Sequence, residues 1–275
     1  MTATLLPMPA VEYHGLVGAI SSSMIRDLID SPRLFHAKYV SCSIQQKATD
    51  AMDLGTAAHC ACLEPDRLGQ VVIAIPREVL SSSGSRAGGA WKQWSQENFG
   101  KVQLKADDYA AVLKIRDAVY AHPLARKYLE CAGHVEYAIL HRDEATNLTC
   151  RARPDKLLTD YPIILDLKTS TETSESWFKR RFVDSQWTIQ DAHYSDSVAA
   201  LGRERPFFVW ILAMTEPPYL PVRVFSVDDT MRLNGIRKRR AALEQIVARR
   251  ESGDWSDNGE AELRIVSFSD WAYSQ

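Results

Sequence analysis

The sequence predicts an α/β fold in which a central mixed β-sheet is flanked by helices. Residues 161–169 alternate polar and apolar side chains around Ile163 and Ile164, a pattern typical of a buried central strand. Two further strands are expected at 207–214 and 222–227, and segments of helical periodicity lie between the strands. Together these patterns favour helices packed on a sheet.

A length of 275 residues suits one large domain, with residues 1–20 as an irregular N-terminal arm and 253–275 as an irregular C-terminal tail. The net charge of −2 gives no overall attraction to nucleic acid, so a DNA-binding field would be local or built by oligomerisation. Five cysteines without a C-x-x-C pair favour a reducing compartment. Because signal-peptide and membrane-spanning patterns are absent, we expect a soluble cytoplasmic protein.

Serines precede the first two expected helices. Ser21 to Ser23 stand before a helix at 24–29, and Ser31 with Pro32 begins another that runs to about residue 40. Capping explains these serines. The N–H groups at a helix start also form a seat for a phosphate, which makes Ser21 and Ser23 candidate DNA contacts.

Between residues 48 and 133 the patterns predict mainly helices. In the helix expected at 48–63, His59 fits a buried core histidine as well as a metal ligand, and Gly55 indicates close packing. A strand at 71–75 and a Gly/Ser-rich loop at 81–89 follow, and the loop is either ordinary or a flap. Further helices are expected at 90–98, at 106–121, and from Pro123 to a capping Gly133.

The next strand, expected at 134–141, carries a carboxylate on an otherwise small and apolar face. Glu136 shares that face with Ala138 and Leu140, which indicates an inward functional acid, although an edge-strand glutamate facing solvent is the alternative. A turn at 143–147 then leads into the segment that delivers Asp155.

Asp166 and Lys168 lie on one face of the strand at 161–169 because strand side chains alternate. A buried carboxylate there is costly unless it is paired or holds a metal. Asp155 precedes this pair in the order P-D, ten residues, D-x-K. Two such acids can hold a hard divalent cation, and the lysine supplies a donor to an attacking water or a scissile phosphate.

The motifs in this order resemble those of the PD-(D/E)XK nucleases, which have a restriction-endonuclease-like core. More narrowly they resemble the RecB-type branch and, in layout and length, nuclease domains of the exonuclease VIII (RecE) type. The resemblance rests on five elements: Gly55-Thr-Ala-Ala-His59, Glu136, Pro154-Asp155, Asp166-Leu167-Lys168 and Gln190-Asp-Ala-His-Tyr194. Some RecB-type relatives hold an iron–sulfur cluster through late cysteines, but no cysteine follows Cys150, so no such cluster is expected.

The resemblance implies a site for Mg²⁺, for which Mn²⁺ can substitute. Its ligands would be Asp155, Asp166, the carbonyl of Leu167 and His59. Glu136 would support a second ion or a bound water, and Lys168 would position the attacking water.

The resemblance also places Gln190 and Tyr194, one helical turn apart, toward the site, where they would steady DNA or a water. A buried tyrosine with a glutamine neighbour is the structural alternative. On a helix expected at 176–183, Lys179, Arg180 and Arg181 suit phosphate contacts, and a solvated basic turn is the alternative.

The last predicted helix covers residues 229–250. Its expected inward residues are Leu233, Ile236, Leu243 and Ile246, and the basic run 237–240 is expected largely on its outer face. Such a run is usually a solvated surface, but it is also a candidate for contacts with the DNA backbone or another subunit.

The function implied by the resemblance is exonucleolytic digestion of linear double-stranded DNA from a 5′ end. It would leave 3′ tails for a single-strand annealing recombinase, with a ring-shaped homo-oligomer around the DNA. The alternatives are an endonuclease or single-strand DNase with the same site, a hydrolase of another phosphodiester, and an inactive DNA-binding protein with the nuclease fold. The presence of all four charged residues, Glu136, Asp155, Asp166 and Lys168, argues against the inactive protein.

Overall fold

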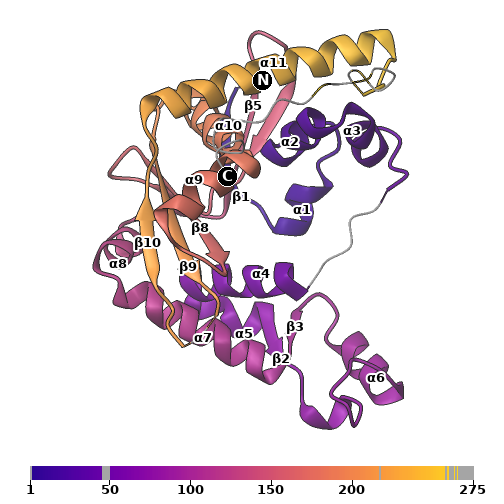
Figure 1. Cartoon of the computed structure of the whole chain (residues 1–275), viewed down its shortest axis with the longest axis vertical. Coiled ribbons are helices and arrows are strands. Elements are labelled where there is room, and N and C mark those ends of the chain that lie inside the picture. Colours follow the sequence, from indigo (N-terminus) through magenta and orange to yellow (C-terminus); the bar gives the residue numbers. More distant parts are fainter. Residues whose placement is uncertain are drawn as a thin grey trace.

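The computed structural model describes residues 2–44, 50–216, 218–257, 259, 263 and 265. Its centre is a five-stranded sheet of order β10-β9-β8-β7-β4 (Figure 1). The middle strand β8 runs parallel to β9 and antiparallel to β7. This mixed sheet with flanking helices confirms the predicted fold class. The strands are β4 (Gly133–Val135), β7 (Lys156–Leu158), β8 (Ile163–Ser170), β9 (Phe207–Met214) and β10 (Val222–Phe225).

The alternation predicted for the central strand separates two layers of helices. Ile164 shares a buried cluster with Phe208 and Trp210 of β9 and with aromatic residues of α9 (Glu175–Asp184) and α10 (Trp187–Ala200). On the opposite face Leu167 packs with residues of α4, α7 and α8. These three helices are α4 (Asp50–Leu63), α7 (Ala106–Ala121) and α8 (Pro123–Glu130).

The remaining helices mostly begin where capping residues predict. Ser21 and Ser31 accept backbone N–H bonds at the starts of α2 and α3. The bounds are α2 (Ser22–Asp30), α3 (Pro32–Tyr39), α5 (Leu68–Val71) and α6 (Gly89–Glu97), with 3₁₀ turns at Pro65–Arg67 and Arg77–Val79. A parallel ribbon joins β2 (Val72–Ala74) to β3 (Val102–Leu104), a strand that the sequence patterns missed. Residues 48 and 49 of the predicted helix 48–63 lie outside the described residues.

The expectation of an irregular arm over residues 1–20 is wrong for residues 4–15. There β1 (Thr4–Pro7) pairs with β5 (Tyr137–Arg142), which in turn pairs with β6 (Thr149–Ala152), and α1 (Ala10–Gly15) follows. Pro7 fits in β1 because β1 is an edge strand, where a missing N–H costs no ladder hydrogen bond.

The strand predicted at 134–141 is divided at Glu136, whose φ of 56° is a left-handed conformation. Residues before it belong to the five-stranded sheet, and residues after it belong to the three-stranded sheet. The chain returns between the same sheets at residues 153–155. The predicted face shared by Glu136 with Ala138 therefore does not exist, since alternation requires a continuous strand. The two segments that pass between the sheets are joined by a hydrogen bond, in which the Glu136 N–H donates to the carbonyl oxygen of Asp155 at 3.1 Å.

Two glycines have structural roles that differ from those predicted. Helix α8 ends at Glu130, and Gly133 begins β4, where a Cβ would lie 2.7 Å from the Leu157 carbonyl oxygen. Gly133 thus permits close strand pairing instead of capping the helix. At Gly55 a Cβ would meet only the Thr169 side chain, at an ordinary 3.6 Å, so the expected tight packing does not occur there.

Tight helix packing occurs instead at Gly235 of α11 (Asp229–Ser252), where a Cβ would lie 2.3 Å from the Thr188 carbonyl oxygen of α10. Gly235→Ala gains about 1 kcal/mol of helix propensity. The clash is with backbone and forces α10 and α11 apart, so we expect the free energy of unfolding to fall by about 1–3 kcal/mol. Urea unfolding measures this change. Asn234→Ala, at the adjacent exposed position, is the control, and equal stability of the two variants would contradict the close contact.

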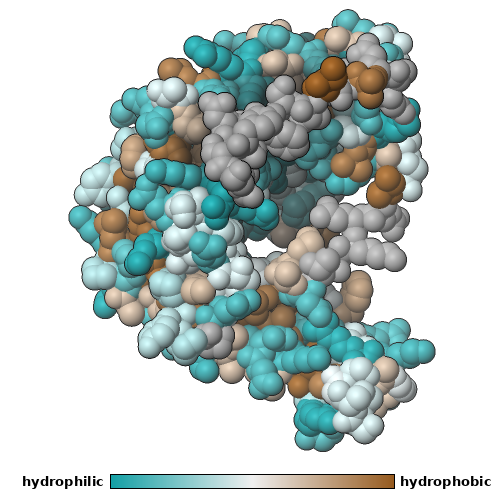
Figure 2. Space-filling model, viewed as in Figure 1, coloured by the Kyte–Doolittle hydropathy of each residue, from teal (hydrophilic) through white to brown (hydrophobic). Residues whose placement is uncertain are grey.

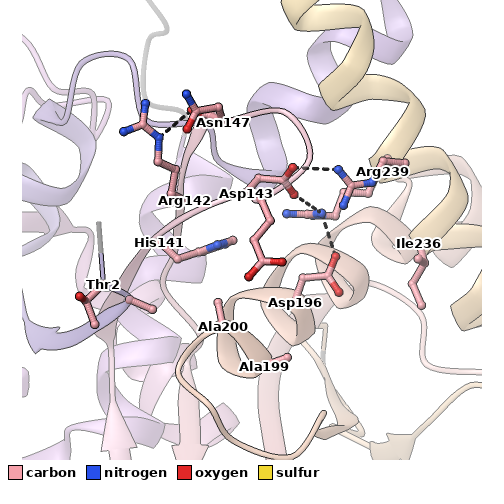
Figure 3. A pocket seen from close by; sticks show the side chains of 13 residues that line it. Thr2, His141, Arg142, Asp143, Asn147, Asp196, Ala199, Ala200, Ile236 and Arg239 are labelled. Carbon is pink, nitrogen blue, oxygen red and sulfur yellow. Dashed lines mark hydrogen bonds and ion pairs between the residues drawn. The ribbon is translucent and has the colours of Figure 1, made fainter.

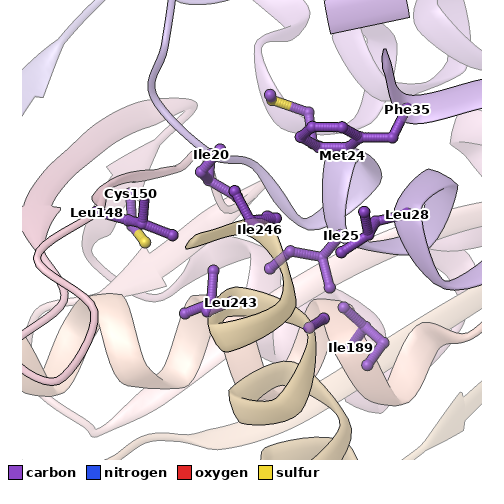
Figure 4. Close-up of a cluster of buried hydrophobic side chains, with 11 residues drawn as sticks. Ile20, Met24, Ile25, Leu28, Phe35, Leu148, Cys150, Ile189, Leu243 and Ile246 are labelled. Carbon is purple, nitrogen blue, oxygen red and sulfur yellow. The ribbon is translucent and has the colours of Figure 1, made fainter. Parts of the chain in front are cut away.

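Helix α11 lies across one end of the molecule and covers a hydrophobic cluster with α2 (Figure 1, Figure 4). Leu243 and Ile246 are fully buried against Ile25 and Leu28, as predicted. Leu233, predicted to face inward, is 51% exposed because the first turns of α11 extend past this cluster.

Arg239 contradicts the expectation that the basic run 237–240 lies on the outer face, because it is only 1% exposed. Its guanidinium contacts Asp143 at 3.4 Å and Asp196 at 2.8 Å (Figure 3). Its Nε donates to Nδ1 of His193. The cost of burying the Arg239 charge is therefore offset by two carboxylates. One comes from the β5–β6 turn and the other from α10, so Arg239 links α11 to both elements.

Replacing Arg239 by methionine preserves much of the buried volume but leaves Asp143 and Asp196 without this cation. Removing one partner of a buried ion pair costs about 3–5 kcal/mol, and Arg240 still pairs with Asp143, so we expect about 3 kcal/mol. Urea unfolding tests this. Arg237→Met, exposed on the same helix, is the matched control. A loss below about 1 kcal/mol would show that the network does not stabilise the fold.

Among the described helices, none combines the length and the apolar character needed to cross a bilayer. The described residues of the predicted irregular tail, 253–257, 259, 263 and 265, contain no helix or strand. The rest of residues 253–275 lies outside the described residues.

Candidate active site

The predicted acidic site lies where the chain crosses between the two sheets. Asp155 precedes β7, and its Oδ2 accepts the backbone N–H of Leu167 in β8 at 2.7 Å. Helix α4 delivers His59, whose Nδ1 lies 3.4 Å from the same Asp155 oxygen. Residues far apart in the sequence therefore meet beside the middle of the central strand β8.

Three side chains in this place present possible metal ligands. One ligand atom each from His59, Glu136 and Asp155 lies within 4.8 Å of the other two. Carboxylate oxygens suit Mg²⁺ and Mn²⁺, and imidazole is a further common donor. The donor set therefore fits a divalent cation, and we call these three residues the ligand cluster.

The charge at Glu136 is only partly compensated within the chain. Burial and the neighbouring Asp155 raise the pKa of Glu136, and Arg153 opposes this effect. Arg153 Nη1 lies 2.9 Å from Glu136 Oε2, and its Nε donates to the Glu136 carbonyl oxygen at 3.0 Å. The carboxylates thus repel one another, which favours a cation between them.

Asp166, at the centre of β8, is fully buried beside this cluster. One of its oxygens pairs with the Lys168 ammonium, and the other accepts from the Gln190 amide. Burial raises the pKa of the Asp166 carboxyl, and the Lys168 charge lowers it. Asp166, a predicted ligand, is therefore held by Lys168 and Gln190, while Glu136 lies with His59 and Asp155 in the ligand cluster.

Two tryptophans lie beneath Lys168. Its Nζ is 5.5 Å from the centroid of Trp210 and 5.8 Å from that of Trp187. These rings are stacked on each other, with an interplanar angle of 10°. Cation–π attraction and the ion pair with Asp166 together hold the ammonium toward the acids.

The first serines come close to the acids. Ser21 and Ser23, with hydroxyl oxygens 2.9 Å apart, line a pocket of about 240 Å³ together with Asp155 and Lys168. Ser21 also caps α2 through the N–H of Met24. Gln190 and Tyr194 line the same pocket, so all four candidates face the site.

The structure adds four residues to this pocket that sequence reasoning had not proposed as site residues: Tyr13, His14, Ser22 and Arg26. Tyr13 and His14 belong to α1, in the segment expected to be irregular, and no motif pointed to them. His14 also lines a second pocket of about 410 Å³, which contains His59, Glu136 and Arg153. The two pockets share His14 and together contain the three residues of the ligand cluster, on the hollowed side of the molecule (Figure 2).

Other predicted features lie away from this site. Lys179, Arg180 and Arg181 are exposed on α9, and in the described residues none of them lines either pocket. Lys179 instead pairs with Glu175 at 2.6 Å. The Gly/Ser-rich loop 81–89 is likewise absent from both linings. A pocket of about 740 Å³ is lined by Arg239 and by none of the three residues of the ligand cluster (Figure 3).

A mixed sheet together with a P-D motif and a D-x-K motif is typical of the PD-(D/E)XK class of proteins. Residues 21–264 match the family described as "PDDEXK-like domain of unknown function (DUF3799)", and the chain belongs to this family. Membership confirms the predicted superfamily. No curated protein sequence matches the chain.

Solved structures are similar in fold. A protein from Eubacterium rectale, provisionally described as an exonuclease, has a TM-score of 0.67 at 13% identity, covering 98% of both chains. LHK-Exo in complex with dAMP has 14% identity and a TM-score of 0.39, covering 88% of this chain and 96% of its own. At such identities only the first comparison supports an argument, and that argument concerns the fold.

Proposed function

We propose that the protein is a divalent-cation-dependent exodeoxyribonuclease that degrades linear double-stranded DNA. The single observation that carries the proposal is the convergence of His59, Glu136 and Asp155 beside the Asp166–Lys168 pair. Hydrolysis of a phosphodiester requires an activated water and compensation of phosphate charge, and these residue types supply both. Membership of a PDDEXK-like family supports the same reaction class.

The cation would be Mg²⁺, with Mn²⁺ as substitute, held by His59, Glu136 and Asp155. A divalent cation, when bound, lowers the pKa of a coordinated water and neutralises charge on a phosphate oxygen. Asp166 and the carbonyl of Leu167 remain candidate ligands beside the cluster. The N–H of Leu167 holds the Asp155 carboxylate in place, which reduces the cost of ordering it.

Lys168 would orient the attacking water and donate to the scissile phosphate. Asp166 and the two tryptophans fix its ammonium, and Gln190 fixes the second oxygen of Asp166. The chain therefore orients its proton donor before DNA enters. Tyr194 would contact the substrate, since it lines the pocket that holds Lys168.

DNA would reach the acids past the N-terminus of α2, where Ser21 and Ser23 offer donors to a phosphate. Lys179, Arg180 and Arg181 on α9 would contact the backbone farther from the cut. We further propose a single nuclease domain that works in the cytoplasm as a ring-shaped homo-oligomer of the exonuclease VIII (RecE) type. It would digest from 5′ ends and leave 3′ tails for an annealing recombinase.

End-labelled linear duplex tests the activity, with Mg²⁺ and with EDTA, beside a closed circular duplex of the same sequence. The expected result is loss of linear DNA only, with mononucleotides released from the 5′ label in the presence of Mg²⁺. Cleavage of the circle would instead indicate an endonuclease. No cleavage of any DNA substrate would support an inactive DNA-binding protein.

A further inference from the structure

Arg153 holds Glu136 by two separate contacts that other residues of the site do not share. Its Nη1 pairs with the Glu136 carboxylate at 2.9 Å, and its Nε donates to the Glu136 carbonyl oxygen at 3.0 Å. Both residues lie where the chain crosses between the sheets, and the backbone of Glu136 is left-handed there. Arg153 therefore fixes the side chain and the backbone of one member of the ligand cluster.

The charges of the ligand cluster, of Asp166 and of the two cations paired with these acids leave room for one divalent cation. The carboxylates of Glu136, Asp155 and Asp166 are three negative charges, and Lys168 and Arg153 contribute two positive charges. With His59 as a neutral ligand, the net charge is −1. One divalent cation brings it to +1, which a phosphodiester group then neutralises.

A second divalent cation at Glu136 would bind a carboxylate that would already hold the first cation and that pairs with the guanidinium of Arg153. Two like charges at such a distance repel strongly in a partly buried site. Glu64, another acid of the same pocket, is already paired with Arg67. The guanidinium of Arg153 thus already supplies a positive charge next to Glu136.

We propose that Arg153 takes the place of a second divalent cation at Glu136, so that the ligand cluster binds one cation and Arg153 supplies the neighbouring positive charge. This inference rests on the proposed metal-dependent function. Arg153 is a positioning residue for Glu136, and its charge sets the number of divalent cations that the ligand cluster binds.

Titration with Mn²⁺, followed by electron paramagnetic resonance and calorimetry without DNA, tests the proposal. The wild-type protein should bind one Mn²⁺ with the spectrum of an isolated ion. Arg153→Gln keeps a donor for the Glu136 carbonyl but removes the charge, and should bind a second Mn²⁺ with an exchange-coupled spectrum. Arg153→Lys should retain the wild-type number because its charge remains.

The matched control is Arg126→Met, which removes an exposed arginine that pairs with Glu130 and lines neither pocket of the site, and should leave the Mn²⁺ number unchanged. A purely structural role for Arg153 would lower the melting temperature of the Gln variant without a second Mn²⁺, and this would overturn the proposal. The wild-type count decides the proposal even if the Gln variant fails to fold.

The wild-type results also separate this inference from the proposed function. An exchange-coupled pair in the wild-type protein would refute the role of Arg153, while Mg²⁺-dependent cleavage of linear DNA would still stand. Absence of bound Mn²⁺, together with no cleavage, would refute both.

Discussion

Lys168→Ala should reduce cleavage of linear duplex by about 10²–10⁴-fold, the range typical of a positioned proton-transfer group. The ammonium is held between Asp166 and two tryptophan rings and points into the pocket shared with Asp155. Alanine leaves this position empty and removes the opposing charge from the Asp166 carboxyl, which then protonates more readily. The initial rate of product release from end-labelled DNA measures the effect.

The control for this variant is Lys114→Ala, an exposed lysine on α7, on the opposite face of the sheet from α10. It should cleave at the wild-type rate. Binding of duplex to the Lys168 variant, measured in the presence of Ca²⁺, should remain within about 10-fold of wild type, because one phosphate contact is lost. A Lys168 variant that cleaves within a few-fold of wild type would remove this residue from the mechanism.

Asp155→Asn should abolish metal binding and lower the rate of cleavage by about 10³-fold. Asparagine keeps an oxygen that can accept the N–H of Leu167, so the local fold should survive. The negative charge that faces His59 and Glu136 is lost, and the ligand cluster then lacks its central carboxylate. Calorimetric titration with Mn²⁺, alongside the cleavage assay, tests both effects.

Asp160→Asn, at an exposed turn between β7 and β8, is the matched control and should bind Mn²⁺ like wild type. The two aspartates lie in neighbouring segments, so a general effect of lost charge would appear in both variants. Normal Mn²⁺ affinity in Asp155→Asn would show that the cation is held elsewhere.

Regular periodicity made much of the fold predictable. The apolar alternation of 161–169 predicted the central strand, and Ser21, Ser31 and Pro123 marked helix starts correctly. Prediction failed where a segment depends on distant partners. The edge strand β1 is stabilised by β5, more than a hundred residues away in the sequence, and no local pattern records that pairing.

The candidate site was predicted by its motifs and rearranged by its geometry. Asp155, Asp166 and Lys168 do come together, and the early serines lie beside them. Sequence reasoning placed Asp166 among the ligands and gave Glu136 a second ion or a bound water. In the structure, Glu136 has a left-handed backbone, its carboxylate lies with His59 and Asp155, and Arg153 lies beside it.

By itself the sequence determined the class of fold and the chemical types at the site, because strand alternation and helix capping depend on near neighbours in the chain. Only the tertiary structure decided which of these groups touch. The partners of Glu136, Arg239 and Asp166 come from other strands and helices, and a buried charge is stabilised by whichever opposite charge the fold places beside it.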